Sequence, residues 1–435
     1  PGCDTFCRVR RPLRYPPSQE ATPGGAVGFV NQPEAAGGGR AGSQLAVRAL
    51  AVYFAIRLLT VPAFVYAWRL QGPNRSSYPD AAPDFLTFLA LSWDGAWYHL
   101  IATQGYPGTL PIDPATGVPA QNAWAFYPLF PMLVRTATGF GVLPYASVAP
   151  LVALLMGAVG SVLLAFLVRD AAAAAVRLRP GLPLLAVAAI AAFPSGATAM
   201  VGYSETTALT LIVASLLLLH RRRYASAMVA IALLGLARGV ALPMAAVVVW
   251  HAWTRLRDAR RSGEAISGHT GAWLGTLFVV AVGSGLVWPA VAGVVTGVPN
   301  AYLRTQAAWR NGLDPQPFGA FARKLSEWVG DLGLPLVLVM VAVLIAISLS
   351  RPVQRLGPEL QAWGGSYLVY ILAVGDLGSS VLRFALLSIT LPLGLVAWSR
   401  RRWVQVSMVL LLLMLQMVWI VRIWVFDGVG DAFPP

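Results

Sequence analysis

The sequence predicts an all-α polytopic membrane protein. Hydrophobic residues make up 57% of the 435 residues, charged residues make up only 11%, and the mean hydropathy is +0.66. Several segments reach the roughly 18 to 20 apolar residues that cross a bilayer as a helix. The net charge of +14 is spread over short arginine clusters between these segments. Such clusters are typical of cytoplasmic loops, so the charge indicates membrane orientation rather than a nucleic-acid partner.

Residues 1–43 are rich in Pro, Gly and Arg and show no periodicity. A segment of this composition buries too little apolar surface to fold, so it predicts a disordered, basic cytoplasmic tail. Residues 44–435 are then a single transmembrane domain. Its first apolar run is long enough to span, which argues against a cleavable signal peptide. Cys3 and Cys7 both lie in the tail, and we expect neither a disulfide framework nor a metal site from them.

The apolar segments predict about eleven membrane spans. We expect them at residues 45–68, 145–168, 182–199, 204–219, 225–238, 240–254, 272–295, 333–350, 363–375, 381–398 and 403–421. With the basic tail inside, the arginine clusters between later spans fall on one side, as the positive-inside rule requires. Residues 69–142 are then an external loop with interfacial helices near 85–103 and 123–140, and 296–331 is a second external loop. We expect a helix break at Arg238-Gly239, in protein or beside a wet cavity.

An acidic motif, Trp93-Asp94-Gly95, lies in the first external loop. A carboxylate just outside the bilayer costs little energy and can still act on a substrate whose lipid tail stays in the membrane. Asp94 is therefore a candidate catalytic base, and capping of the helix that follows is the alternative role. The topology gathers further polar residues on this side: His99, Gln121, Asn122, Tyr203, Glu205, Arg238, Gln306, Trp309, Asp376 and Arg383. Polar groups from many segments on one face suit a lipid-linked substrate.

Two arginines flanked by apolar sequence, Arg238 and Arg383, are candidate ligands for a phosphate group, because a guanidinium binds phosphate through charged, planar hydrogen bonds. Interfacial anchoring is the alternative for each. His99 is a third candidate phosphate ligand, with an interfacial hydrogen bond as its alternative. Glu205 contacts a substrate, pairs with an arginine or caps the next helix. Because no Asp-x-Asp pair lies near Asp94, we predict no tightly bound metal and no other cofactor.

Six short motifs, taken in order, resemble the PIG-V type of mannosyltransferase. They are Trp93-Asp94-Gly95 through Gly105-Tyr106, Ala125-Phe126-Tyr127-Pro128-Leu129-Phe130-Pro131, Gly202-Tyr203-Ser204-Glu205, Ala237-Arg238-Gly239-Val240, Tyr302 with Gln306 and Trp309, and Leu382-Arg383-Phe384-Ala385-Leu386. In that family a Trp-Asp motif ending in Gly-Tyr precedes Ala-Phe-x-Pro-Leu-x-Pro and then Tyr-Ser-Glu. Each motif is short, but their order and their predicted topology agree from about Trp93 to Leu393.

The resemblance implies a GT-C glycosyltransferase fold and activity. Such an enzyme moves a sugar, here mannose, from a polyprenyl-phosphate donor at the external face, with inversion, and Asp94 matches the base. Arg238, Arg383 and His99 are then expected at the donor phosphate. Asn122, Tyr203, Glu205, Gln306 and Trp309 are expected at the acceptor or the sugar. The amino-acid bias resembles that of a GC-rich bacterium, so we expect a bacterial plasma membrane and a lipid or glycan acceptor of the cell envelope.

Other functions remain open at this point. A transferase of another sugar, such as arabinose or glucose, would need the same chemical groups. A transporter or flippase would place charges near the bilayer midplane and show inverted repeats with broken helices, whereas this sequence has no evident internal repeat and gathers its polar residues toward one face. A noncatalytic lipid-binding or scaffold protein is a further alternative.

Overall fold

The computed structural model describes residues 34–71, 83–263, 265, 267–310, 316–375 and 380–425. These residues are mostly helical, with an isolated bridge between Ile112 and Pro119. The chain divides into two units, 1–42 and 43–435, and apart from the helical residues 34–42 the description below concerns the second. The all-α class predicted from the sequence is therefore confirmed for the described residues.

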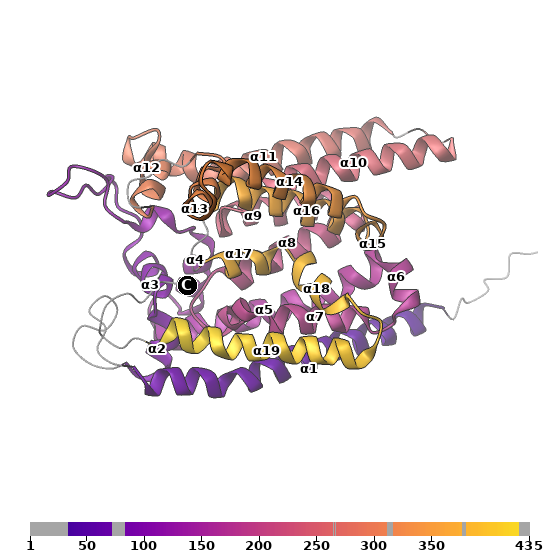
Figure 1. The fold of residues 1–435 in the computed structure, drawn as a ribbon, viewed down its shortest axis with the longest axis horizontal. Helices are drawn as coiled ribbons and strands as arrows, with labels where there is room; N and C mark the ends of the chain where they lie inside the picture. The colour runs from indigo at the N-terminus through magenta and orange to yellow at the C-terminus, as the bar shows by residue number, and fades with distance from the viewer. Residues whose placement is uncertain are drawn as a thin grey trace, which may run out of the picture. The chain divides into compact units, whose positions relative to one another are not determined.

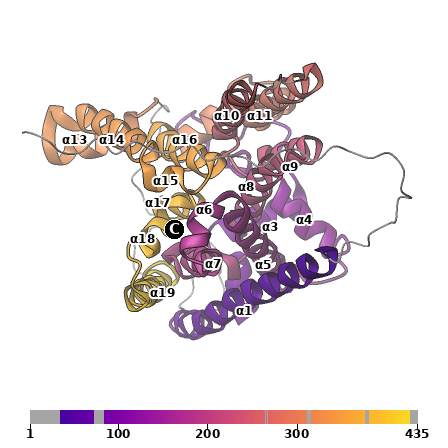
Figure 2. The same cartoon turned by 90° about the vertical axis from the view of Figure 1, so that its right-hand side faces the viewer.

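Nineteen α-helices and three short 3-10 helices are described, and most are labelled in Figures 1 and 2. They are α1 (Glu34–Arg69), α2 (Phe85–Leu91), α3 (Asp94–Gln104), η1 (Ala123–Ala125), α4 (Leu129–Ala137), α5 (Tyr145–Ala171), α6 (Ala173–Leu178), α7 (Leu182–Ala192), η2 (Pro194–Met200), α8 (Glu205–His220), α9 (Tyr224–Ala237), α10 (Pro243–Ser262), α11 (Gly268–Thr296), α12 (Ala301–Ala308), α13 (Gly319–Val329), η3 (Gly330–Leu332), α14 (Gly333–Ser348), α15 (Arg351–Gln354), α16 (Pro358–Val374), α17 (Val381–Leu387), α18 (Thr390–Ala397) and α19 (Arg402–Trp424).

Several helices are long and apolar enough to cross a membrane. Five helical stretches meet this condition by length and composition, or six when the bent pair of α7 and η2 is taken as one span. The five are Arg40–Arg69, Tyr145–Ala171, Gly268–Thr296, Gly319–Ser348 and Arg402–Trp424, and α8 and α9 are shorter apolar helices. The described residues are therefore those of a helical protein with several membrane-length helices.

Most predicted segments correspond to helices, and four boundaries need correction. The disordered tail expected over 1–43 is wrong for 34–43, because α1 begins at Glu34, and the expected tail up to residue 33 lies outside the described residues. The segment 182–199 bends by 82° between α7 and η2, where Pro194 interrupts the helix. The segment 381–398 breaks between α17 and α18, and the membrane-length stretch Gly319–Ser348 begins inside the predicted loop 296–331.

The largest apolar core packs α5, α7, α8, α9, α10, α16 and α18 against one another. Helices α10 and α11 lie side by side in both views (Figures 1 and 2). A second, aromatic core joins α1 to α19, where the rings of Phe64 and Trp424 meet edge to face at 5.8 Å. Both cores bury the apolar residues that face neighbouring helices, while many apolar side chains on the outer helix faces stay exposed. That pattern is expected of helices surrounded by lipid.

Helices α8 and α9 form an antiparallel hairpin with two chemically different ends. Glu205 begins α8 and Arg238 directly follows α9, so both lie at one end. The other end carries Arg221, which pairs with Asp170 from the end of α5 at 2.7 Å. Glu205 and the arginine cluster of residues 221–223 therefore lie at opposite ends of the hairpin.

A buried polar cluster joins α8, α10 and α16 near the basic end. Glu359 Oε1 accepts a hydrogen bond from His251 Nδ1 at 2.8 Å, and its Oε2 accepts one from His220 Nδ1 at 3.2 Å. Burial alone would raise the pKa of Glu359, but these hydrogen bonds outweigh it and lower the pKa to about 2. The hydrogen bond to Glu359 raises the pKa of His220. Both groups lie just outside the apolar segments 204–219 and 363–375.

Candidate functional site

Four charged side chains, predicted from distant parts of the sequence, meet in one network. Arg383 Nη1 donates to Asp94 Oδ2 at 2.6 Å and lies 3.2 Å from Glu205 Oε1. Arg238 Nη1 donates to the same Glu205 oxygen at 2.9 Å. The Glu205 side chain is fully buried, and the side chains of Arg383, Arg238 and Asp94 are 6%, 12% and 16% exposed. We call these four residues the charged network, and its formal charges balance.

Close backbone packing sets the position of Asp94. Trp93 precedes α3 with φ 53° and ψ −119°, a rare conformation for a residue other than glycine. A Cβ atom at Gly95 would lie 2.2 Å from the carbonyl oxygen of Ala90, and one at Gly202 would lie 2.6 Å from the same oxygen. Only glycine fits at both positions, so the end of α2 contacts the Trp-Asp-Gly and Gly-Tyr-Ser-Glu motifs together.

Asp94 does not cap α3. The residue at the N-cap is Trp93, and no side chain there accepts a hydrogen bond from the helix. Asp94 is instead the first residue of α3, and its carboxylate points to Arg383. Its backbone N–H donates to Tyr203 Oη at 3.3 Å, which links it to the turn before α8. The capping role considered for Asp94 is therefore wrong.

The break between α9 and α10 brings Arg238 into the network. Helix α9 ends at Ala237, and Arg238 has an extended backbone with φ −168° and ψ 156°. The predicted break at this junction is therefore confirmed. Arg238 Nη1 also lies 3.2 Å from Ser204 Oγ, which exchanges a 2.7 Å hydrogen bond with Tyr98 Oη of α3. Of the three roles open to Glu205, pairing with arginine is the one present in this structure.

Arg383 lies on the short helix α17 and is held from several sides. Its Nη2 atom donates to Ser380 Oγ at 3.1 Å, and its guanidinium lies over the Tyr203 ring at 5.3 Å. Within the described residues, neither Arg383 Nε nor Glu205 Oε2 has a hydrogen-bond partner, and both atoms are buried. A buried polar atom without a partner is costly, so both atoms favour a polar ligand beside the network.

The other predicted site residues lie outside the charged network. Asn122 is buried, and its amide holds the local backbone. Its Oδ1 accepts a hydrogen bond from Trp124 N at 3.0 Å, and its Nδ2 donates one to the Ala120 carbonyl at 2.9 Å. Gln306 hydrogen-bonds Tyr302. The ring of Trp309 meets those of Trp97 and Phe126 edge to face, each at 5.5 Å. Asp376 lies outside the described residues.

His99 is placed differently from the other candidate phosphate ligands. It lies five residues after Asp94, about 140° around the helix, and its ring packs against Tyr145 at 4.7 Å. Burial lowers the pKa of His99, so the imidazole is neutral at pH 7. A neutral ring turned away from Asp94 is poorly suited to a phosphate held by the charged network.

Two aromatic residues of this region, which the sequence favoured only as anchors of the helix at the lipid head groups, take part in the site. Tyr98 is buried and its hydroxyl bonds Ser204, so it connects α3 to the arginine side of the network. Trp97 stacks on Phe126 with ring centroids 5.6 Å apart and an interplanar angle of 12°. Both follow Asp94 at i+3 and i+4, positions that lie on the same side of a helix as residue i. This spacing from Asp94 is the sequence feature that could have identified Trp97 and Tyr98 as neighbours of the site.

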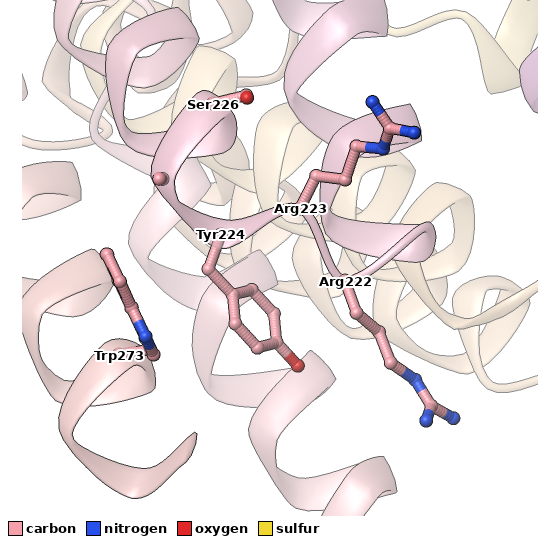
Figure 3. Close-up of a pocket in the computed structure, with 6 residues that line it drawn as sticks. Arg222, Arg223, Tyr224, Ser226 and Trp273 are labelled. Carbon is pink, nitrogen blue, oxygen red and sulfur yellow. The ribbon is translucent and has the colours of Figure 1, made fainter. Parts of the chain in front are cut away.

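A cavity of about 440 Å³ lies at the start of α9, at the basic end of the hairpin. Its lining includes Arg222, Arg223, Tyr224 and Trp273. Figure 3 shows both arginine side chains directed away from the gap between Tyr224 and Trp273. Because Tyr224 begins α9 and Arg238 follows its last residue, this cavity and the charged network occupy opposite ends of one helix. We take the charged network as the candidate site, because its charged side chains are largely buried and face one another, whereas the two arginines at the cavity point away from it.

Comparison with known proteins assigns no role to the charged network, so its function is argued from its chemistry. No family model matches the chain, and no curated protein matches it. Within the described residues, no group of three or more His, Cys, Asp and Glu side chains is arranged to hold a metal ion.

Proposed function

We propose that this protein is a polyprenyl-phosphate-dependent glycosyltransferase that resembles the PIG-V type and transfers mannose to a lipid or glycan acceptor. The observation that carries the proposal is the charged network, in which two buried arginines meet the acidic residue of the Trp-Asp-Gly motif. The reaction needs a base for the acceptor hydroxyl and cations for the departing phosphate. The network contains both kinds of group.

The proposed reaction is a direct displacement. The acceptor oxygen forms a bond to the anomeric carbon, the bond from that carbon to the phosphate oxygen breaks, and the hydroxyl proton passes to the Asp94 carboxylate. The polyprenyl phosphate leaves as an anion beside Arg383 and Arg238. A single displacement inverts the anomeric centre.

Donor binding prepares the base in this scheme. Arg383 Nη1 bonds Asp94 and also lies close to Glu205, so two carboxylates share one guanidinium. A donor phosphate competes with Asp94 for Arg383, since a guanidinium binds phosphate and carboxylate through the same charged, planar hydrogen bonds. Asp94, the more exposed of the two carboxylates, is the one that moves. The released Asp94 oxygen then takes the proton from the hydroxyl of the acceptor substrate. This order of events predicts that the donor binds before the acceptor.

The fold proposed here is of GT-C type, with about eleven spans, a cytoplasmic N-terminus and the site at the external face of a bacterial plasma membrane. The basic clusters near α5 and α8 support this orientation, because arginine-rich ends favour the cytoplasm. A cysteine at Thr116, in a variant with Cys3 and Cys7 replaced by serine, should be labelled by an impermeant thiol reagent on intact cells. A cysteine at Ser262 should not. The reverse pattern would put Asp94 in the cytoplasm and end the proposal.

The activity is tested with purified protein, radiolabelled polyprenyl-phosphate mannose and extracted membrane lipids. A labelled, alkali-stable product with an α-linked mannose is expected. Parallel reactions with polyprenyl-phosphate arabinose and glucose decide the sugar. Transfer of one of these instead would assign another glycosyltransferase activity, and absence of transfer from all three donors would contradict the proposal.

A further inference from the structure

A cavity of about 310 Å³ is lined by residues of α3 and by residues that follow it. Its lining includes Trp97, Gln104, Tyr106 and Gln121, and every residue that lines it is uncharged. Small-molecule sites span roughly 300–1,000 Å³ and combine apolar walls with a few polar groups. This cavity, which we call the amide–aromatic pocket, has both features and is suited to a neutral ligand.

Two glutamine amides supply the polar groups of the pocket. Gln104 and Gln121 are exposed, and neither side chain hydrogen-bonds another residue in the described part of the chain. Each amide can donate and accept, which matches a hydroxyl group that also does both. The neighbouring Asn122 differs, since its amide is already bonded to Trp124, Ala120 and Thr305.

Two rings supply the apolar wall. Trp97 is fixed by stacking on Phe126 and by its edge contact with Trp309. Tyr106 stacks on Trp124 at 4.7 Å, and its hydroxyl donates to the Phe126 carbonyl at 3.0 Å. Rigid aromatic faces bind the C–H face of a sugar ring, whose hydroxyls then point to the surrounding amides. The pocket therefore has the chemistry of a carbohydrate site.

The place of the pocket along α3 separates it from the donor sugar. Trp97 lies three residues after Asp94, and Gln104 lies ten residues after it. At 1.5 Å per residue, these positions are about 4.5 Å and about 15 Å along the helix from Asp94. Because Arg383 contacts Asp94, a single sugar held at either residue does not reach Gln104. An acceptor of two or more sugars, with its reacting hydroxyl at Asp94, is long enough to extend along α3 to the pocket.

We infer that the amide–aromatic pocket binds the neutral sugar of the acceptor, so that the acceptor is a glycan or glycoside rather than a simple lipid alcohol. This inference rests on the proposed function for the identity of the two substrates. The binding of a neutral glycoside is testable without it.

Binding is measured with radiolabelled octyl α-D-mannopyranoside and the full-length protein in phosphatidylcholine nanodiscs, because maltoside detergents carry competing sugars. We expect saturable binding that Gln104→Ala and Gln121→Ala each weaken about 2- to 10-fold, as expected for loss of a neutral hydrogen bond. The control is Gln354→Ala on α15, which should bind normally. Absence of saturable binding, or binding insensitive to both pocket changes, overturns the inference.

Steady-state kinetics then identify the sugar in the pocket. With an octyl mannobioside as acceptor and polyprenyl-phosphate mannose as donor, both pocket variants should raise the KM for the acceptor and leave the KM for the donor unchanged. The opposite result assigns the pocket to the donor sugar and overturns the inference. If glutamine-dependent binding is found without any sugar transfer, the proposed function fails while the carbohydrate site stands.

Discussion

Removal of the Arg383 side chain should affect stability and donor use by separable routes. Arg383→Ala leaves Asp94 and Glu205 with Arg238 as the remaining arginine of the network, so its formal charge becomes −1. Breaking a buried ion pair typically costs about 3–5 kcal/mol. The lower value applies here, because Asp94 is 16% exposed and Glu205 keeps Arg238. At roughly 2 °C per kcal/mol for a large domain, the unfolding midpoint should fall by about 6 °C.

Charge compensation distinguishes the two routes. Glu205→Gln added to Arg383→Ala returns the network to a formal charge of zero, so it should recover part of the lost stability. It should not recover use of the donor, because the phosphate contact is still missing. Arg383→Lys should recover donor use only in part, since it keeps the charge and loses the planar fork. Arg304→Ala, at an exposed arginine of α12, is the matched control.

The assay combines thermal unfolding in nanodiscs with transfer kinetics in which the polyprenyl-phosphate donor is varied. Our reasoning is refuted if a folded Arg383→Ala protein keeps the KM and kcat of the wild type for the donor. It is also refuted if the added Glu205→Gln lowers the unfolding midpoint further, because the charge balance would then not be what stabilises the network.

Two further predictions concern packing and pH. Gly95→Ala should abolish transfer and lower the unfolding midpoint, because its Cβ would lie 2.2 Å from a backbone oxygen. Gly108 has open space around it, so the control Gly108→Ala should behave as wild type. Equal midpoints for the two variants would contradict the packing argument. The Glu359 cluster should stabilise the fold most between about pH 4.5 and 6.5. Its contribution is lost on acidification as Glu359 is protonated, and lost on alkalinisation as His220, whose pKa is raised, loses its proton. Unfolding midpoints measured across pH should therefore vary less in Glu359→Gln, and equal pH profiles would remove the cluster from the stability of the fold.

The positions of the helices were largely predictable from the length of the apolar segments, whereas the bends between helices were harder to predict. Pro194 marks the bend after α7, since proline cannot continue the hydrogen-bonding of a helix. The break between α17 and α18 has a less direct marker, because Pro392 lies in the first turn of α18 and cannot donate a helical hydrogen bond back to Ser388. Ile389 there has φ 61°, a strained conformation for a branched residue that nothing in the sequence predicted. Membrane-span counts from sequence therefore agree better with helix positions than with helix continuity.

The members of the charged network were predictable, while their pairing was not. The topology expected from the sequence put Asp94, Glu205, Arg238 and Arg383 on one side of the membrane, and the resemblance in motif order suggested a common role. The contact between Asp94 and Arg383 joins residues 289 positions apart, which no spacing rule relates. The capping role considered as the alternative for Asp94 was wrong, because Trp93 holds the N-cap position and α3 begins at Asp94 itself.

The central claim is that Asp94 acts as the base in sugar transfer. The most direct measurement compares initial rates of mannose transfer from polyprenyl-phosphate mannose by Asp94→Asn and Asp113→Asn, both purified in nanodiscs. Asp113 lies between α3 and η1 and accepts a local hydrogen bond from Ala115 N, which asparagine can also accept. Asp94→Asn should turn over about 10²- to 10⁴-fold more slowly than the wild type and still bind donor, and Asp113→Asn should match the wild type. A wild-type rate in a folded Asp94→Asn protein would contradict the account.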